Sequence, residues 1–120
     1  MKFRESERTF IAAGVEIRHM ADVELADDEQ VTFVAASGSE YDVVRKSWGY
    51  YATPSLNGRL PAHGLRPVLA ANPAGKAFLL LVEEGCEEDL AGYLSEQSMR
   101  ILAWLDADDG IATLEARLGG

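Results

Sequence analysis

Residues 65–82 read LRPVLAANPAGKAFLLLV, and this stretch decides the fold. Two apolar runs, 65–71 and 76–82, flank the turn-forming residues Asn72-Pro73-Ala74-Gly75, which is the pattern of a β-hairpin. Positions 78–82 are all apolar, so we expect the second strand to lie at the centre of a sheet, covered on both faces. The rest of the chain must then supply neighbouring strands and a helix.

The sequence after the hairpin predicts the helices. The first is expected over 87–95, where apolar residues recur with helical spacing and acidic residues occupy the first turn. Residues 99–105 fit either a strand or a helix, and their alternation favours a strand. Asp109 is expected to cap a last short helix that ends at Gly119-Gly120.

The sequence before the hairpin predicts antiparallel strands. Apolar and polar residues alternate over 15–25, as in a half-buried strand. The short runs 31–35 and 41–45 follow, joined by polar turns as in a meander. The chain is therefore interpreted as one α+β domain over residues 1–120. It should form an antiparallel-rich sheet or small open barrel of about five to seven strands, with one or two short helices in the C-terminal third.

Composition bears on where the protein resides. Apolar residues make up 48 % and charged residues 26 %, which is typical of a folded globule. The longest uncharged apolar run, 77–82, is far shorter than the about 20 residues of a membrane-spanning helix. The N-terminus is charged and lacks the apolar stretch of a secretion signal. Together with the single cysteine, Cys86, these features predict a cytoplasmic protein.

The charge balance limits the partners. Twenty acidic residues against eleven basic ones give a formal net charge of −9. That field repels phosphate backbones and anionic lipids, so we expect neither nucleic acid nor a membrane as a partner.

The sequence predicts no metal and no cofactor. His19 and His63 each lack a metal-ligand neighbour at i+2 or i+4, and the acidic residues around Gly110 do not have the spacing of a calcium loop. No phosphate loop or dinucleotide fingerprint occurs. Acidic residues surround Cys86 and disfavour a reactive thiolate, so this cysteine is interpreted as a small apolar residue.

The candidate site lies in the middle of the chain. Residues 49–64 form the longest stretch without periodicity, and long ordered loops are often functional. Aromatic and cationic side chains of this stretch and its flanks are of the kinds that dominate binding sites. The candidate ligand-binding residues are Trp48, Tyr50, Tyr51, Asn57, Arg59, His63 and Arg66. In the alternative interpretation, the aromatic side chains only close the end of a barrel.

Two functions fit these residues. The favoured one is a non-catalytic binding or accessory module that uses residues 48–66 to hold a small polar or anionic ligand, or a protein partner. The alternative is a small cofactor-independent isomerase or hydrolase with His63 or His19 as the base and Arg59 or Arg66 as the substrate clamp. Homo-oligomerisation is compatible with either function.

Overall fold

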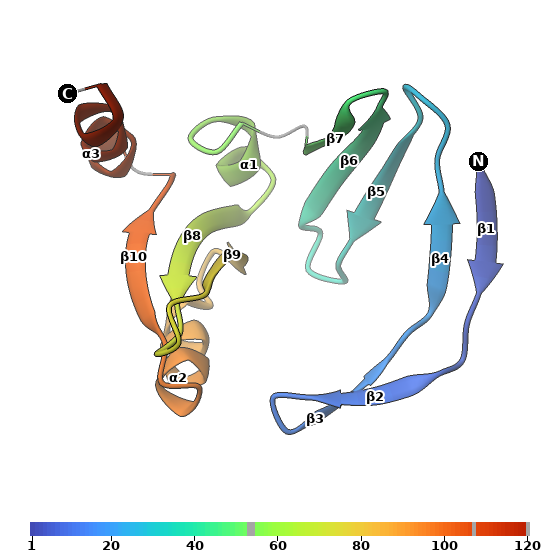
Figure 1. The fold of residues 1–120 in the computed structure, drawn as a ribbon, viewed down its shortest axis with the longest axis horizontal. Coiled ribbons are helices and arrows are strands. Elements are labelled where there is room, and N and C mark those ends of the chain that lie inside the picture. Colours follow the sequence, from blue (N-terminus) through green and yellow to red (C-terminus); the bar gives the residue numbers. More distant parts are fainter. Residues whose placement is uncertain (53–54, 107, 120) are drawn as a thin grey trace. The chain divides into compact units, whose positions relative to one another are not determined.

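The computed structural model describes residues 1–52, 55–106 and 108–119 and divides the chain into two compact units (Figure 1). Unit 1 is Met1–Thr32 with Asp42–Thr53, and unit 2 is Phe33–Tyr41 with Pro54–Gly120. The described ranges hold ten strands in four small, mostly antiparallel sheets, and three helices. The predicted mixture of antiparallel strands and helices is thus confirmed, while a single domain over 1–120 stays a prediction.

The structure differs in detail from the predicted single sheet or barrel of about five to seven strands. Much of the difference comes from the N-terminal residues, which pair with each other as ribbons. They form four strands: β1 (Lys2–Glu5), β2 (Thr9–Ala12), β3 (Val15–Arg18) and β4 (Ala21–Glu24). β1 pairs only with β4, and β2 only with β3, both antiparallel. Ala13 and Gly14, with φ of 50° and 76°, have the left-handed backbone that a tight two-residue hairpin turn requires.

One extra residue separates the two ribbons. The N–H of Ser6 donates to the carbonyl of Met20 at 2.8 Å, and the N–H of His19 donates to the carbonyl of Arg8 at 2.9 Å. Glu7 therefore stands between the two ladders as the extra residue of a β-bulge, which bends a hairpin and shifts its register by one. This is why the predicted strand over 15–25 appears as two strands.

The bulge also sets the apolar face of this hairpin. Phe3 lies opposite Val23, and Phe10 lies opposite Ile17. Because the register shifts by one residue at the bulge, an odd-numbered residue of β1 (Phe3) and an even-numbered residue of β2 (Phe10) both lie opposite odd-numbered residues of the partner strands. These four side chains are between 38 % and 59 % exposed, so the predicted half-buried strand is exposed on its apolar side. Within the described residues of unit 1 no hydrophobic side chain is buried, which explains this exposure.

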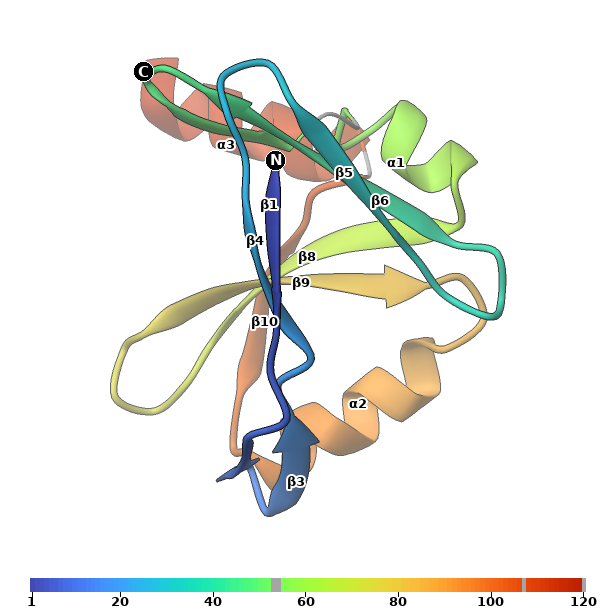
Figure 2. The same cartoon turned by 90° about the vertical axis from the view of Figure 1, so that its right-hand side faces the viewer.

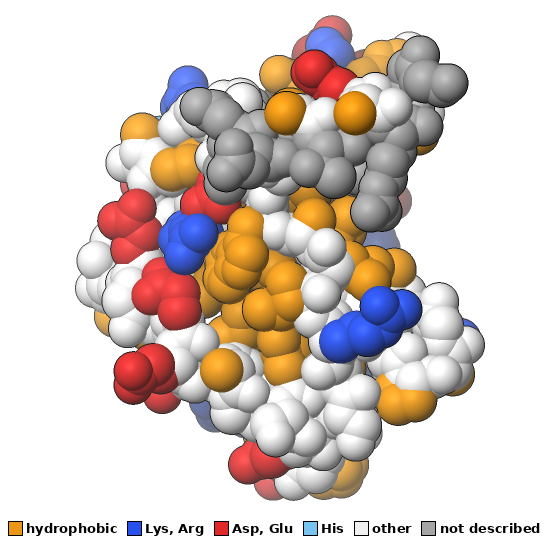
Figure 3. Space-filling model, turned by 90° about the vertical axis from the view of Figure 1, so that its left-hand side faces the viewer, with side chains coloured by type: hydrophobic (Ala, Val, Ile, Leu, Met, Phe, Trp, Pro, Cys, Tyr) orange, Lys and Arg blue, Asp and Glu red, His pale blue; other side chains and the backbone are white. Residues whose placement is uncertain are grey.

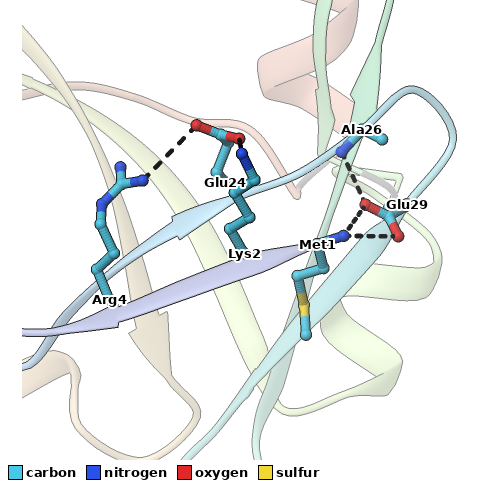
Figure 4. A network of polar contacts seen from close by, with 6 residues as sticks. All are labelled: Met1, Lys2, Arg4, Glu24, Ala26 and Glu29. Atoms are coloured by element: carbon cyan, nitrogen blue, oxygen red, sulfur yellow. Dashed lines mark hydrogen bonds and ion pairs between the residues drawn. The ribbon is translucent and has the colours of Figure 1, made fainter.

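The other face of the β1–β4 ribbon is charged (Figure 4). Nζ of Lys2 and a guanidinium nitrogen of Arg4 each lie 3.7 Å from a carboxylate oxygen of Glu24. Beyond the ribbon, the N–H of Ala26 donates to Glu29 at 2.7 Å, and the α-amino group of the first residue lies 3.0 Å from the same oxygen. These two contacts, the backbone hydrogen bond first, lower the pKa of Glu29.

A three-stranded sheet follows in the order β5-β6-β7, with β5 (Gln30–Val34), β6 (Glu40–Lys46) and β7 (Gly49–Ala52). The strands predicted over 31–35 and 41–45 correspond to β5 and β6. β7 pairs antiparallel with β6 and occupies the start of the stretch predicted as irregular. Its two tyrosines favour extended backbone, which local breakers further along the stretch had obscured.

The hairpin predicted over 65–82 is present in unit 2. β8 (Leu65–Ala71) pairs antiparallel with β9 (Ala77–Glu83), and β10 (Arg100–Trp104) pairs with the other side of β8. Residues 99–105 are therefore mainly a strand, as favoured. The prediction that 78–82 form a central, covered strand is wrong, because β8 takes the centre and β9 lies at the edge of the sheet. Phe78 and Leu79 on β9 are 41 % and 51 % exposed.

The helices of unit 2 are α1 (Arg59–Ala62), α2 (Glu87–Glu96) and α3 (Asp108–Gly119), so one helix lies outside the C-terminal third. α2 lies along β9, as Figure 2 shows, and α1 packs against β8. α3 begins at Asp108, so Asp109 lies inside the helix, and the side chain of Asp109 lies outside the described part. Among the residues of this unit whose burial is described, the buried ones are Leu60, Leu65, Pro67, Val68, Ala70, Ala71, Val82, Leu94 and Leu105. Among the described residues, none of the helices is long and apolar enough to cross a membrane.

Candidate functional site

The seven residues predicted to bind a ligand are divided between the two units. Trp48, in the β6–β7 turn, and Tyr50 and Tyr51, on β7, belong to unit 1. The others, which belong to unit 2, are Asn57, Arg59, His63 and Arg66.

The three candidate aromatic side chains of unit 1 do not line one common surface. Trp48 is 70 % exposed in its turn. Tyr50 lies opposite Arg45, whose guanidinium carbon is 5.2 Å from the centre of its ring. Tyr51 is the next residue along the strand, so it points to the opposite face. The ring of Tyr50 is therefore already in contact with a cation, and the two tyrosines serve different faces of the sheet.

Arg66 is held by acidic and aromatic neighbours. Its Nε donates to Oδ2 of Asp106 at 2.6 Å, and a terminal nitrogen lies 3.7 Å from Glu87. Its guanidinium also lies 4.1 Å from the ring centre of Trp104. The hydrogen bond to Asp106 is the main cause of a raised pKa of Arg66. In this arrangement Arg66 connects β8 to the segment after β10, while its role in holding an anionic ligand stays a prediction.

Asn57, which precedes α1, and Arg59, the first residue of α1, are both exposed. The backbone N–H of Arg59 donates to Oγ of Ser55 at 2.8 Å, and this contact supports the turn that enters α1. The buried residue of α1 is Leu60, which anchors the helix on β8. Residues 59–62 thus form a short helix in the stretch that was predicted to be irregular.

His63 opens onto a cavity of about 400 Å³ in unit 2. Three segments meet there: the tip of the β5–β6 hairpin, the end of α1, and the end of β9. The N–H of Glu84 donates to the carbonyl of Gly64 at 3.0 Å and holds the last two segments together. The cavity is lined by Ser37, Gly38, Ser39, Ala62, His63, Gly64, Glu83 and Glu84.

Two serine hydroxyls hold the carboxylate of Glu83 at this cavity. Oγ of Ser37 donates to Oε1 of Glu83 at 2.6 Å, and Oγ of Ser39 donates to the same oxygen at 2.8 Å. Both hydrogen bonds favour the charged form and lower the pKa of Glu83, with Ser37 the larger cause. The cavity therefore presents a fixed negative charge at neutral pH.

The imidazole of His63 lies beside a second carboxylate. Its Nδ1 is 3.6 Å from Oε2 of Glu40, and the two side chains are 31 % and 42 % exposed. This separation is longer than a hydrogen bond, so the contact is an electrostatic one. Among the described residues, no hydroxyl or thiol hydrogen-bonds to His63.

Sequence reasoning found His63 but missed most of the residues around it. Ser37 and Ser39 were interpreted as part of a turn, and Glu83 only as one of the acidic residues that surround Cys86. The two serines lie 46 and 44 residues from Glu83 along the chain, so only the tertiary fold brings them together. No local sequence signal marks that meeting.

A second cavity of about 370 Å³ lies between α2 and β9. Leu80, Val82, Leu90 and Tyr93 are among its lining residues, together with the free thiol of Cys86. Glu83 and Asp89 are its charged lining residues, and among the described residues no pair of hydroxyl donors like Ser37 and Ser39 lines it. Within the described residues, no group of three His, Cys, Asp or Glu side chains could hold a metal ion.

Comparison with protein-family models, with curated proteins and with solved structures gave no match.

The serine contacts of Glu83 can be tested by titration. In the double variant Ser37→Ala/Ser39→Ala we expect the pKa of Glu83 to rise towards that of an ordinary glutamate, because both donors to the charged form are lost. A lowered pKa stabilises the folded state above the unfolded-state pKa, and this contribution disappears as the pH falls through the folded-state pKa. The stability difference between wild type and the variant should therefore vanish in acid.

The measurement is an NMR titration of the Glu83 side-chain carboxyl carbon, with urea unfolding at neutral and acid pH. Ser95→Ala, which changes an exposed serine of α2, is the matched control and should leave the titration of Glu83 unaltered. An identical titration curve in wild type and the double variant would contradict the assigned hydrogen bonds.

Proposed function

We propose that the chain is a non-catalytic binding module that holds a small polar ligand in the cavity around Glu83. The observation that supports this most is the meeting of two serine hydroxyls and a fixed carboxylate in a cavity of about 400 Å³. Cavities with a few convergent polar groups are the usual sites of small ligands. The stretch 48–66 contributes to it through Ala62, His63 and Gly64.

Charge narrows the class of ligand. Glu83 and Glu84 line the cavity, Glu40 lies beside it, and no arginine or lysine is among the lining residues that the structure describes. Carboxylates repel anions and attract ammonium groups. Of the small polar and anionic ligands that fit the sequence, we therefore favour a ligand that carries an amine and hydroxyl groups, such as an amino sugar or a polyamine.

Thermal shift and calorimetric titration with glucosamine, putrescine, phosphate and citrate test this proposal. We expect the amines to stabilise the wild type and Glu83→Gln to weaken their binding about tenfold, because a charge-assisted contact is lost. Glu88→Gln removes the same charge from an exposed position of α2 and should bind as the wild type does. Stabilisation by the anions alone, or an equal response of both variants, would refute the proposal.

The pairing of His63 with Glu40 favours one alternative, a small cofactor-independent isomerase or hydrolase. A carboxylate beside an imidazole can orient it as a general base. In that case His63→Ala would abolish turnover of a bound amine substrate without releasing it. For location, we propose the cytoplasm, because the free thiol of Cys86 is compatible with a reducing compartment.

A further inference from the structure

β9 is an edge strand with the sequence of a central one. Its residues 77–82 are apolar without interruption, and Phe78 and Leu79 are 41 % and 51 % exposed. Edge strands are usually protected from pairing by charged residues, proline or bulges. The register of β9 with β8 runs unbroken from Leu65↔Glu83 to Ala71↔Ala77, so no bulge protects it.

The backbone groups on the free side of β9 can be identified from its pairing. Glu84 bonds to Gly64 across the ladder, and bonding positions alternate along antiparallel strands, so residues 78, 80 and 82 bond to β8. Pro67 has no N–H and lies opposite Leu81, which agrees with this alternation. The N–H and C=O groups of Leu79 and Leu81 therefore point away from β8, and no described residue hydrogen-bonds to them.

The opposite edge of the sheet differs. The register of β10 shifts between Ile101 and Ala103, and the strand begins with Arg100. A bulge and a charge are both devices that discourage edge pairing. Ile101 and Leu102 are 42 % and 45 % exposed, and Figure 3 shows hydrophobic side chains gathered on the side where β10 lies. The edge with free, regular backbone is nevertheless β9.

We propose that β9 pairs antiparallel with β9 of a second copy of this chain, about a twofold axis at Leu80. The two three-stranded sheets then become one six-stranded sheet, and β9 becomes the central strand that its sequence predicts. In this register Leu79 of each copy exchanges two hydrogen bonds with Leu81 of the other. Phe78 lies opposite Val82, so each cross-strand pair of residues 78–82 is apolar.

Charge selects this register over its neighbours. It places Lys76 of each copy opposite Glu84 of the other, and neither side chain takes part in an ion pair among the described residues. Moving the axis to Leu79 places Lys76 opposite Val82, and moving it to Leu81 places Glu84 opposite Phe78. If the twofold axis passed between two residues, backbone groups that point towards the second copy would lie opposite groups that point towards β8, and the two strands could not form their hydrogen bonds. Glu84 also lines the cavity, so in the dimer Lys76 of the second copy would neutralise the negative charge of Glu84. The negative charge of Glu83 would remain in the cavity.

Charge reversal tests the register. Sedimentation equilibrium of the wild type should give twice the mass of the chain at high micromolar concentration. Lys76→Glu and Glu84→Lys should each weaken the dimer roughly tenfold, because two attractive pairs become two repulsive ones. The double variant Lys76→Glu/Glu84→Lys should restore the wild-type dissociation constant.

Leu79→Pro removes an outward N–H without removing a bond to β8, so this variant should be a folded monomer by circular dichroism and sedimentation. A monomeric wild type overturns the proposal. So does a dimer that withstands Leu79→Pro, or one that the charge swap fails to restore, since the contact would then lie elsewhere or in another register.

Discussion

Leu60→Ala is expected to lower the free energy of unfolding of unit 2 by about 2–5 kcal/mol, the range for leucine truncation in a close-packed core. Leu60 is 1 % exposed and is the buried residue of α1. A helix of four residues has no stability of its own, because forming the first turn costs more than its hydrogen bonds return. α1 is therefore held in place by its contact with β8.

Urea unfolding followed by circular dichroism measures this loss. Leu102→Ala is the matched control, because it removes the same atoms from a side chain that is 45 % exposed on β10. The control should cost less than about 1 kcal/mol, since a partly exposed leucine leaves little cavity behind. Equal losses in the two variants would mean that α1 does not pack on β8 as described.

The position of α1 also matters for the cavity. His63 and Gly64 follow α1 directly and line the cavity together with Ala62. If α1 loses its anchor, these residues lose their fixed position relative to Glu83. We therefore expect Leu60→Ala to weaken the binding of any amine found with the wild type, even where the variant is still folded. The packing of Leu60 against β8 and the shape of the proposed binding cavity therefore depend on each other through α1.

The β8–β9 hairpin could be predicted because its signals are local. The side chain of Asn72 accepts a hydrogen bond from the N–H of Lys76 at 2.9 Å, and Gly75 has a φ of 86°. Asparagine and glycine are the residues that such a turn favours. The order of the strands is not local, and the central place of β9 was predicted wrongly for the single chain. An uninterrupted apolar run is typical of a strand that is covered on both faces, but it does not show which part of the protein, or which partner, covers it.

The strands β1 and β2 were missed for a different reason. Alternation along one strand is the main sequence signal, and the extra residue Glu7 changes its phase between Phe3 and Phe10. The charged residues of 2–8 further weaken the alternation of apolar and polar residues in this part of the sequence. The cavity shows a third kind of limit, because Ser37 and Glu83 become neighbours only when a hairpin tip and a strand end meet. Sequence reasoning reached His63 there because this residue stands in the long stretch without periodicity, near Arg59 and Arg66.

Gly110→Ala should destabilise the protein by about 1–3 kcal/mol through overpacking, although alanine is the better helix former by about 1 kcal/mol. A Cβ atom at Gly110, in the first turn of α3, would overlap the carbonyl oxygen of Trp104. The backbone at Trp104 cannot easily move away, because the residues that follow it are held in place. The next residue, Leu105, is 5 % exposed and donates its N–H to Pro67 at 2.9 Å, and Asp106 holds Arg66.

Gly92→Ala provides the opposite expectation in the same protein. Gly92 lies inside α2, and nothing comes within 4 Å of the place where its Cβ would stand. There the helix preference acts alone, so Gly92→Ala should raise the free energy of unfolding by about 0.5–1 kcal/mol. Urea unfolding of both variants should therefore give shifts of opposite sign. If Gly110→Ala also stabilised the protein, the close approach of α3 to the end of β10, and with it the placement of Asp106 beside Arg66, would have to be revised.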